Sequence, residues 1–168
     1  MPKLTRDDVL SLIAERLARG TQELYLKGAD LSGIDLSGLD LHNARLRQAN
    51  LSSTDLHEAN LSGSDLMEAD LSLSDLRKAD LYQANLTGAD LTGANLTFAH
   101  LAQANCTAAL FREANLTFAD ARRANFTLAD LSKSNLREAK LNGAILEQAD
   151  LTNTKLQGTL MPNGSKHD

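Results

Sequence analysis

A five-residue phrase repeats without interruption from Ala29 to Gly158, and it limits what this chain can fold into. The phrase reads Ala, Asp or Asn, Leu, Ser or Thr, Gly, and we call its third residue the centre. Of the 26 centres between Leu31 and Leu156, 22 are Leu, and the residue two positions earlier is Ala in 19 of the 26 phrases. The centres that are not Leu are Cys106, Phe111, Ala121 and Phe126.

The phrase predicts short extended segments separated by corners. Residues two apart on an extended backbone point the same way, so the Ala and the centre face inward and the Asp or Asn between them faces outward. The Ser, Thr and Gly residues that follow must turn the chain. Repetition of a short strand and a corner winds the chain into a solenoid whose coils stack about 4.8 Å apart. With only 4% aromatic residues and no Trp, the core must be thin and built mainly of Leu and Ala.

Longer recurrences indicate the length of one coil. The segment 94–99, Ala-Asn-Leu-Thr-Phe-Ala, recurs at 114–119, which is 20 residues later. The segment 28–33 is echoed at 88–93, an interval of 60 residues. Both intervals are multiples of 20, so they favour four phrases in each coil.

These tandem phrases of the form Ala-Asp/Asn-Leu-x-x resemble the pentapeptide-repeat proteins. The resemblance covers about four fifths of the chain, and the helix before the repeat and the ending Met161–Gly164 are similar to members common in cyanobacteria. It implies an all-β solenoid, a right-handed four-sided (quadrilateral) β-helix with an N-terminal α-helical cap. At four phrases per coil, the 26 phrases give about six and a half coils.

Residues 1–23 do not follow the repeat and are predicted to form a capping helix over about residues 6–19. Thr5 and Asp8 have the spacing of a capping box, with Asp in place of Glu. An apolar stripe for packing on the first coil is predicted from Val9, Leu10, Ile13 and Leu17. Docking of this helix on a partner is the alternative.

The rest of the chain divides into a β-helix over 24–160 and a C-terminal tail over 161–168. Pro162 is expected to stop further pairing, and the polar residues that follow are expected to be loose. The last coil would then be an open edge, which either the tail or a second chain must cover. We therefore expect a monomer or an end-to-end homodimer through the C-terminal coil.

Composition narrows the classes of protein that fit. The first residues contain no apolar run of signal-peptide type, and no segment approaches the roughly 20 apolar residues of a membrane helix. A single Cys excludes an internal disulfide and offers no metal cluster. A net charge of −5 argues against direct nucleic-acid binding. We expect a cytoplasmic protein with no membrane contact.

Acidic residues concentrate in the N-terminal half, which carries the whole net charge. If residues 20 apart stack, the outward Asp residues form columns along the solenoid. One interpretation is local hydrogen bonding beside the turns. The other is an acidic face that receives a basic partner or imitates a nucleic-acid backbone. The candidate partner residues in these columns are Asp55, Asp65, Asp70, Asp75 and Asp90, together with the outward Leu110.

Two further departures from the phrase are informative. Phe98 and Phe118 occupy the same corner in adjacent coils and are predicted to stack as an exposed pair, either as a partner surface or as a local brace. His100 is predicted to lie between Asp80 and Asp120 in one column.

No candidate catalytic constellation emerges. Cys106 is a centre, so it should be buried and inert. We find no nucleophile with a base, no phosphate-binding Gly loop, no cofactor site and no metal cluster. The prediction is a non-catalytic structural module for an unidentified protein partner, not an enzyme. The alternative is a DNA mimic that binds a type II topoisomerase (DNA gyrase), as in the quinolone-resistance branch of the family that the chain resembles. An enzyme using the acidic columns is a third class.

Overall fold

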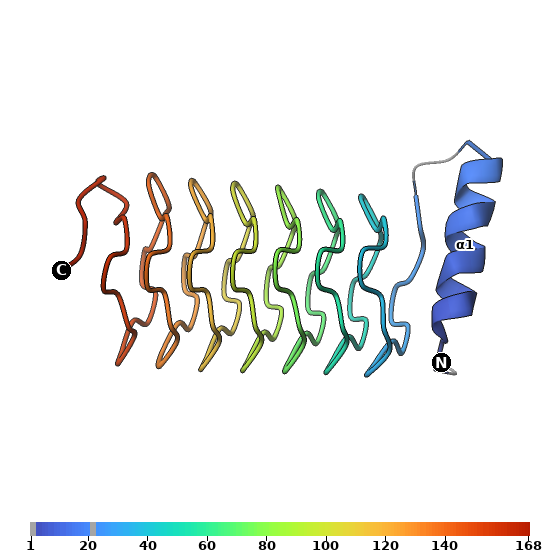
Figure 1. The fold of residues 1–168 in the computed structure, drawn as a ribbon, viewed down its shortest axis with the longest axis horizontal. Helices are drawn as coiled ribbons and strands as arrows, with labels where there is room; N and C mark the ends of the chain where they lie inside the picture. The colour runs from blue at the N-terminus through green and yellow to red at the C-terminus, as the bar shows by residue number, and fades with distance from the viewer. Residues whose placement is uncertain (1–2, 21–22) are drawn as a thin grey trace.

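The computed structural model describes residues 3–20 and 23–168. Stacked coils form a rod, with the helix α1 (Arg6–Ala18) across one end and the C-terminus at the other, as Figure 1 shows. The sequence boundary predicted at residues 23–24 lies beside the undescribed pair 21–22.

Adjacent coils are joined by parallel β-bridges between residues 20 apart. The series runs from Tyr25–Arg45 to Lys140–Leu160. In the described part of the chain each bridge is a single residue pair and no longer strand forms. One coil therefore takes 20 residues, or four phrases, which is the register that the recurrences predict.

The backbone N–H groups of one phrase are all used, as the phrase 49–53 illustrates. The N–H groups of Asn50, Leu51 and Ser53 donate to carbonyls of adjacent coils at 2.9, 2.7 and 2.8 Å. The N–H of Ala49 donates to the carbonyl of the preceding centre at 3.0 Å, which closes the corner. The remaining N–H, that of Ser52, donates to the side-chain Oδ1 of Asn50 at 3.1 Å. The Asp or Asn of the phrase thus satisfies the donor that the coils leave over.

The last position of each phrase has a left-handed backbone. In the 26 phrases, which all lie in the described part of the chain, this position is held by 19 non-glycine residues, with φ between 55° and 62°, and by seven glycines. Gly and Asn adopt this conformation at low cost, whereas other L-residues cost roughly 1–2 kcal/mol more. Bulky residues at this position are therefore held there by the coils on either side.

The core is one continuous stack of buried Leu and Ala. Cys106 is fully buried, as predicted for a centre. Phe111 and Phe126 meet edge to face with their ring centroids 5.6 Å apart. Two other centres nearby are the small Cys106 and Ala121, so the total volume of the core is kept nearly constant through these coils.

The capping helix docks through a different stripe from the one predicted. Thr5 and Asp8 form the capping box. Val9 is buried and Ile13 partly buried, but Leu10 and Leu17 are 40% and 69% exposed. The prediction for Leu10 and Leu17 was wrong because the position facing the first coil one turn after Ile13 is taken by Arg16.

Arg16 is buried against the first coil. Only 4% of the residue is exposed, and its guanidinium pairs with Asp40 Oδ2 at 3.1 Å. It also donates to the carbonyls of Asp40 and His42, both at 3.3 Å. Arg16 thus satisfies backbone acceptors that an apolar residue would leave unpaired.

The C-terminal tail is paired with the last coil rather than loose. Leu160 forms an antiparallel bridge with Lys166. Gly158 donates to the carbonyl of His167 at 2.7 Å, and His167 donates back to Thr159 at 2.9 Å. The expectation of a loose tail was wrong because Gly164, with φ of 84°, reverses the chain after Pro162.

We expect Arg16→Met to lower the free energy of unfolding by about 2 kcal/mol, because it leaves two partly buried carbonyls and Asp40 Oδ2 without their donor. The matched control is Arg19→Met, since Arg19 is exposed and, among the described residues, its side chain pairs with Glu15 of the helix alone; this change should have almost no effect. Urea unfolding measures both. Equal losses for the two variants would contradict the docking role of Arg16.

Candidate functional site

The acidic candidates lie in three separate columns. Asp70 and Asp90 follow one another in the first, with Leu110 next in line. Asp55 and Asp75 are neighbours in the second, and Asp65 belongs to a third, between Arg45 and Asn85. The structure therefore brings these side chains together as short runs rather than as one acidic face. Leu110 is half-buried between Asp90 and Asp130.

The carboxylates in these columns are engaged locally. Oδ1 of Asp70 and Oδ1 of Asp90 accept backbone N–H groups two residues later, at 2.9 and 2.8 Å. Asp65 does the same at 3.3 Å. This geometry favours the local hydrogen-bonding interpretation for these three residues.

Asp55 and Asp75 also have charged partners. His57 Nδ1 lies 2.7 Å from Asp55 Oδ1, and Arg77 binds both oxygens of Asp75 in a forked pair. The hydrogen bond from Arg77 holds the pKa of Asp75 below its ordinary value, and the hydrogen bond to Asp55 raises the pKa of His57. Arg77 therefore balances the charge of Asp75, and His57 balances that of Asp55 whenever it is protonated.

Phe98 and Phe118 form the predicted exposed stack. Their ring centroids are 4.9 Å apart and the rings are almost parallel, at 6°. Residue exposures are 56% and 47%. A groove of about 460 Å³ adjoins Phe98, lined by His57, Glu58, Arg77, Lys78, Thr97 and Phe98.

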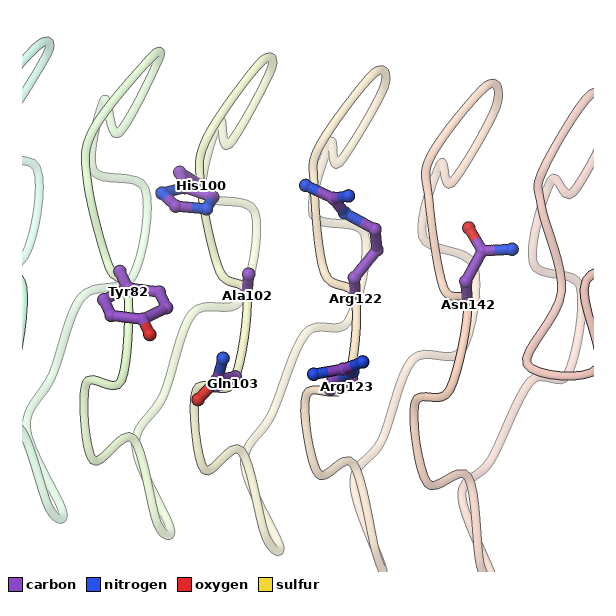
Figure 2. Close-up of a pocket in the computed structure, with 7 residues that line it drawn as sticks. All are labelled: Tyr82, His100, Ala102, Gln103, Arg122, Arg123 and Asn142. Atoms are coloured by element: carbon purple, nitrogen blue, oxygen red, sulfur yellow. The ribbon is translucent and has the colours of Figure 1, made fainter.

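A second hollow was not predicted from the sequence. It has a volume of about 420 Å³ and is shown in Figure 2. Ala102 forms its floor, with Tyr82 and Arg122 in the neighbouring coils on either side. The sequence did contain a sign of this hollow. Ala102 is small, whereas the residues 20 positions before and after it, Tyr82 and Arg122, are large. The lining residues are Tyr82, His100, Ala102, Gln103, Arg122, Arg123 and Asn142.

His100 lies between Asp80 and Asp120 in its column, as predicted. Its Nδ1 is 3.1 Å from Asp80 Oδ1, and its ring stacks on Tyr82 with centroids 5.6 Å apart. Arg122 makes a forked pair with Asp120 at 2.8 and 2.6 Å, which lowers the pKa of that carboxyl. These contacts hold the rim of the hollow in place.

Three further features bear on the chemistry of the chain: the thiol of Cys106, the groups that could bind a metal ion, and the helices. Burial raises the pKa of the Cys106 thiol, so the thiolate nucleophile is disfavoured. Among residues 3–20 and 23–168, no group of three His, Cys, Asp or Glu side chains is placed to hold a metal ion. Within the same ranges, no helix has the length and apolar character needed to cross a bilayer.

The repeat identifies the family. A family model described as Pentapeptide repeats matches residues 25–63, 54–93, 89–127 and 129–163. These matches cover most of the chain, which therefore belongs to the pentapeptide-repeat family. No curated protein sequence matches the chain at a significant level.

Solved structures include relatives with the same β-helical fold. HetL is a pentapeptide repeat protein involved in heterocyst differentiation regulation from the cyanobacterium Nostoc sp. strain PCC 7120; it is 28% identical, with a TM-score of 0.54, and the match covers 98% of this chain and 100% of HetL. A trypsin-treated form of QnrB1, a plasmid-mediated fluoroquinolone resistance protein, is 21% identical, with a TM-score of 0.60 and 78% of each chain covered. The likeness to QnrB1 concerns the fold alone.

The pairing of Asp75 with Arg77 predicts a pH effect. The pKa of Asp75 is lower in the folded than in the unfolded chain, so its ionised form stabilises the fold above the unfolded pKa, and this contribution is lost as the pH falls through the folded pKa. We expect Asp75→Asn to flatten the fall in unfolding free energy between about pH 5 and pH 2. Asn95 shows that the column accepts Asn.

Urea unfolding at a series of pH values measures this effect. Arg77→Gln serves as the matched variant, because it keeps the carboxylate and removes the donor, and it should flatten the curve in the same direction. If the wild type and both variants lose stability in parallel, the pair does not contribute.

Proposed function

We propose that this protein is a non-catalytic structural module that presents ladders of side chains on a rigid rod to a protein partner. The exposed stack of Phe98 and Phe118 is the observation that carries the proposal. Both residues have left-handed backbones, with φ of 60° and 59°, at a position where most phrases place Gly or a polar residue. Because bulky residues cost free energy there and gain little burial, their presence supports a role in binding.

The groove beside Phe98 suggests the chemistry of the partner. Lys78 pairs with Glu58 across the groove at 2.9 Å, and Arg77 is held by Asp75, so charges of both signs surround the rings. An apolar side chain resting on the two rings, flanked by polar groups, would match this surface.

The shape of the rod supports this function. We propose the right-handed quadrilateral form, with four faces and about six and a half coils, on the basis of the 20-residue register and the family. Such a rod holds successive residues of one column about 4.8 Å apart and requires no rearrangement on binding.

The C-terminal coil bears on the oligomeric state. Its inward residues Leu146, Leu151 and Leu156 are only partly buried, although the tail pairs with the backbone nearby. We propose a monomer that is able to form an end-to-end homodimer through this coil.

We also propose a cytoplasmic location, which the unpaired thiol of Cys106 supports.

A second candidate is a DNA mimic that binds a type II topoisomerase, DNA gyrase. The net charge of −5 and the likeness in fold to QnrB1 favour it. The local pairing of Asp55 and Asp75 weighs against it, because a mimic needs unbalanced negative charge. A DNA gyrase supercoiling assay separates the two, since only the mimic would inhibit or protect the enzyme at micromolar concentration.

We expect the double variant Phe98→Asn/Phe118→Asn to lose the partner while keeping the fold. Asn suits a left-handed backbone, so the free energy of unfolding should stay within about 1 kcal/mol of the wild type or rise. Quantitative pull-downs followed by mass spectrometry measure the partner.

The matched control is Leu128→Asn. Leu128 is also exposed, at 54%, and left-handed, at 62°, but it lies in another column. The control should retain every protein that the wild type captures. A double variant that captures the same proteins as the wild type, with the same yield, would rule out the Phe pair as the partner surface.

A further inference from the structure

The hollow over Ala102 differs from the Phe surface in both position and chemistry. Tyr82, His100, Arg122 and Arg123 surround Ala102 in Figure 2. The volume of about 420 Å³ lies within the range of small-molecule pockets. Its lining combines two aromatic rings with guanidinium and amide donors, so a ligand that fills the hollow must satisfy both.

The floor of the hollow carries an unpaired backbone donor. In the regular phrase, the N–H after the centre donates to the Asp or Asn side chain two residues earlier, as Thr97 does to Asn95 at 3.2 Å. In the phrase of Ala102 that place is taken by His100, whose Nδ1 faces Asp80. No acceptor within the described residues pairs with the N–H of Ala102, although this residue is only 7% exposed. An oxygen atom is missing at this point of the repeat.

The side chains beside the floor are also donors. The guanidinium of Arg123 makes no ion pair or hydrogen bond with another described residue, and the next residue in its column is Gly143, which has no side chain to cover it. Gln103 accepts from Gln83 at 3.0 Å through its Oε1, which leaves its N–H groups for another acceptor. Arg122 is already neutralised by Asp120. The hollow therefore offers one unbalanced positive charge and several N–H donors.

The space above Ala102 is long enough along the rod to admit one flat ring. Tyr82 and Arg122 lie in the same column two coils apart, with the short Ala102 between them. Two coil steps span about 9.6 Å, whereas a ring in contact on both faces needs about 7 Å. The stacking of Tyr82 on His100, at 12° between the ring planes, fixes one wall, and the forked pair with Asp120 fixes the guanidinium of the other.

We propose that this hollow binds a small organic anion in which a carboxylate or a phosphate is attached to a flat ring. The oxyanion takes the position that an Asp or Asn Oδ1 holds in the regular phrase and accepts the N–H of Ala102. Arg123 balances its charge. The ring lies over Ala102, between Tyr82 and Arg122.

Isothermal titration calorimetry on the full chain tests the proposal with phenylacetate and phenyl phosphate as probes. At least one of them should bind with a dissociation constant of about 1 mM or tighter. Acetate, which lacks the ring, and benzyl alcohol, which lacks the charge, should bind at least roughly tenfold more weakly. The stronger of the two probes identifies the head group. Binding of neither probe overturns the proposal.

Two variants test the assigned roles. His100→Asn supplies the missing Oδ1 to the N–H of Ala102, so it should raise the melting temperature and weaken probe binding at least roughly tenfold. Arg123→Gln should weaken binding by a similar factor without unfolding the chain, because Gln103 already has the same backbone conformation, with φ of 60° against 58°.

Arg47→Gln is the matched control, since it removes one positive charge in a distant coil. It should bind the probes as the wild type does. Wild-type affinity in both His100→Asn and Arg123→Gln, or an equal loss in Arg47→Gln, would overturn the proposal.

Discussion

In most phrases, the backbone N–H after the centre donates to the Asp or Asn two residues earlier, and this hydrogen bond satisfies the last backbone donor of the phrase. Three N–H groups of a phrase donate to adjacent coils and a fourth closes the corner. The fifth donates to the side chain of the Asp or Asn, as Ser52 does to Asn50. A solenoid with a thin core has few other ways to satisfy that donor, which lies close to the surface of the Leu stack. Each fully buried Leu centre then contributes about 2 kcal/mol from the area it removes from water.

The need to satisfy every backbone N–H explains the composition of the surface as well as that of the core. Asp and Asn recur along the rod because their Oδ1 is needed, so an acidic column is first a product of the fold. Residues that break the rule are free of that requirement and are better candidates for function. His100 leaves the N–H of Ala102 without an acceptor, and Phe98 and Phe118 occupy left-handed positions that Gly or Asn would fill at lower cost.

The regular part of the structure could be predicted from the sequence because each phrase repeats the same local rule. The 20-residue register, the burial of Cys106 and the Phe98–Phe118 stack all follow from counting along the chain. The two ends of the rod and the hollow could not be predicted from the sequence. Helical periodicity does not distinguish the stripe containing Leu17 from the one containing Arg16, because the choice depends on carbonyls of the first coil. The hollow arises because Ala102 has a short side chain and His100 supplies no Oδ1 acceptor. The sequence alone does not show that these two features meet at one place on the surface.

The distance between two spin labels tests whether coils of 20 residues stack along the rod. Gln48 and Gln148 are exposed, share one column and lie 100 residues apart, and the buried Cys106 leaves the introduced Gln48→Cys and Gln148→Cys thiols as the labelling sites. Five coil steps predict a backbone separation of about 24 Å by pulsed electron paramagnetic resonance. Coils of 15 or 25 residues would instead give about 32 or about 19 Å, and either value would contradict the register.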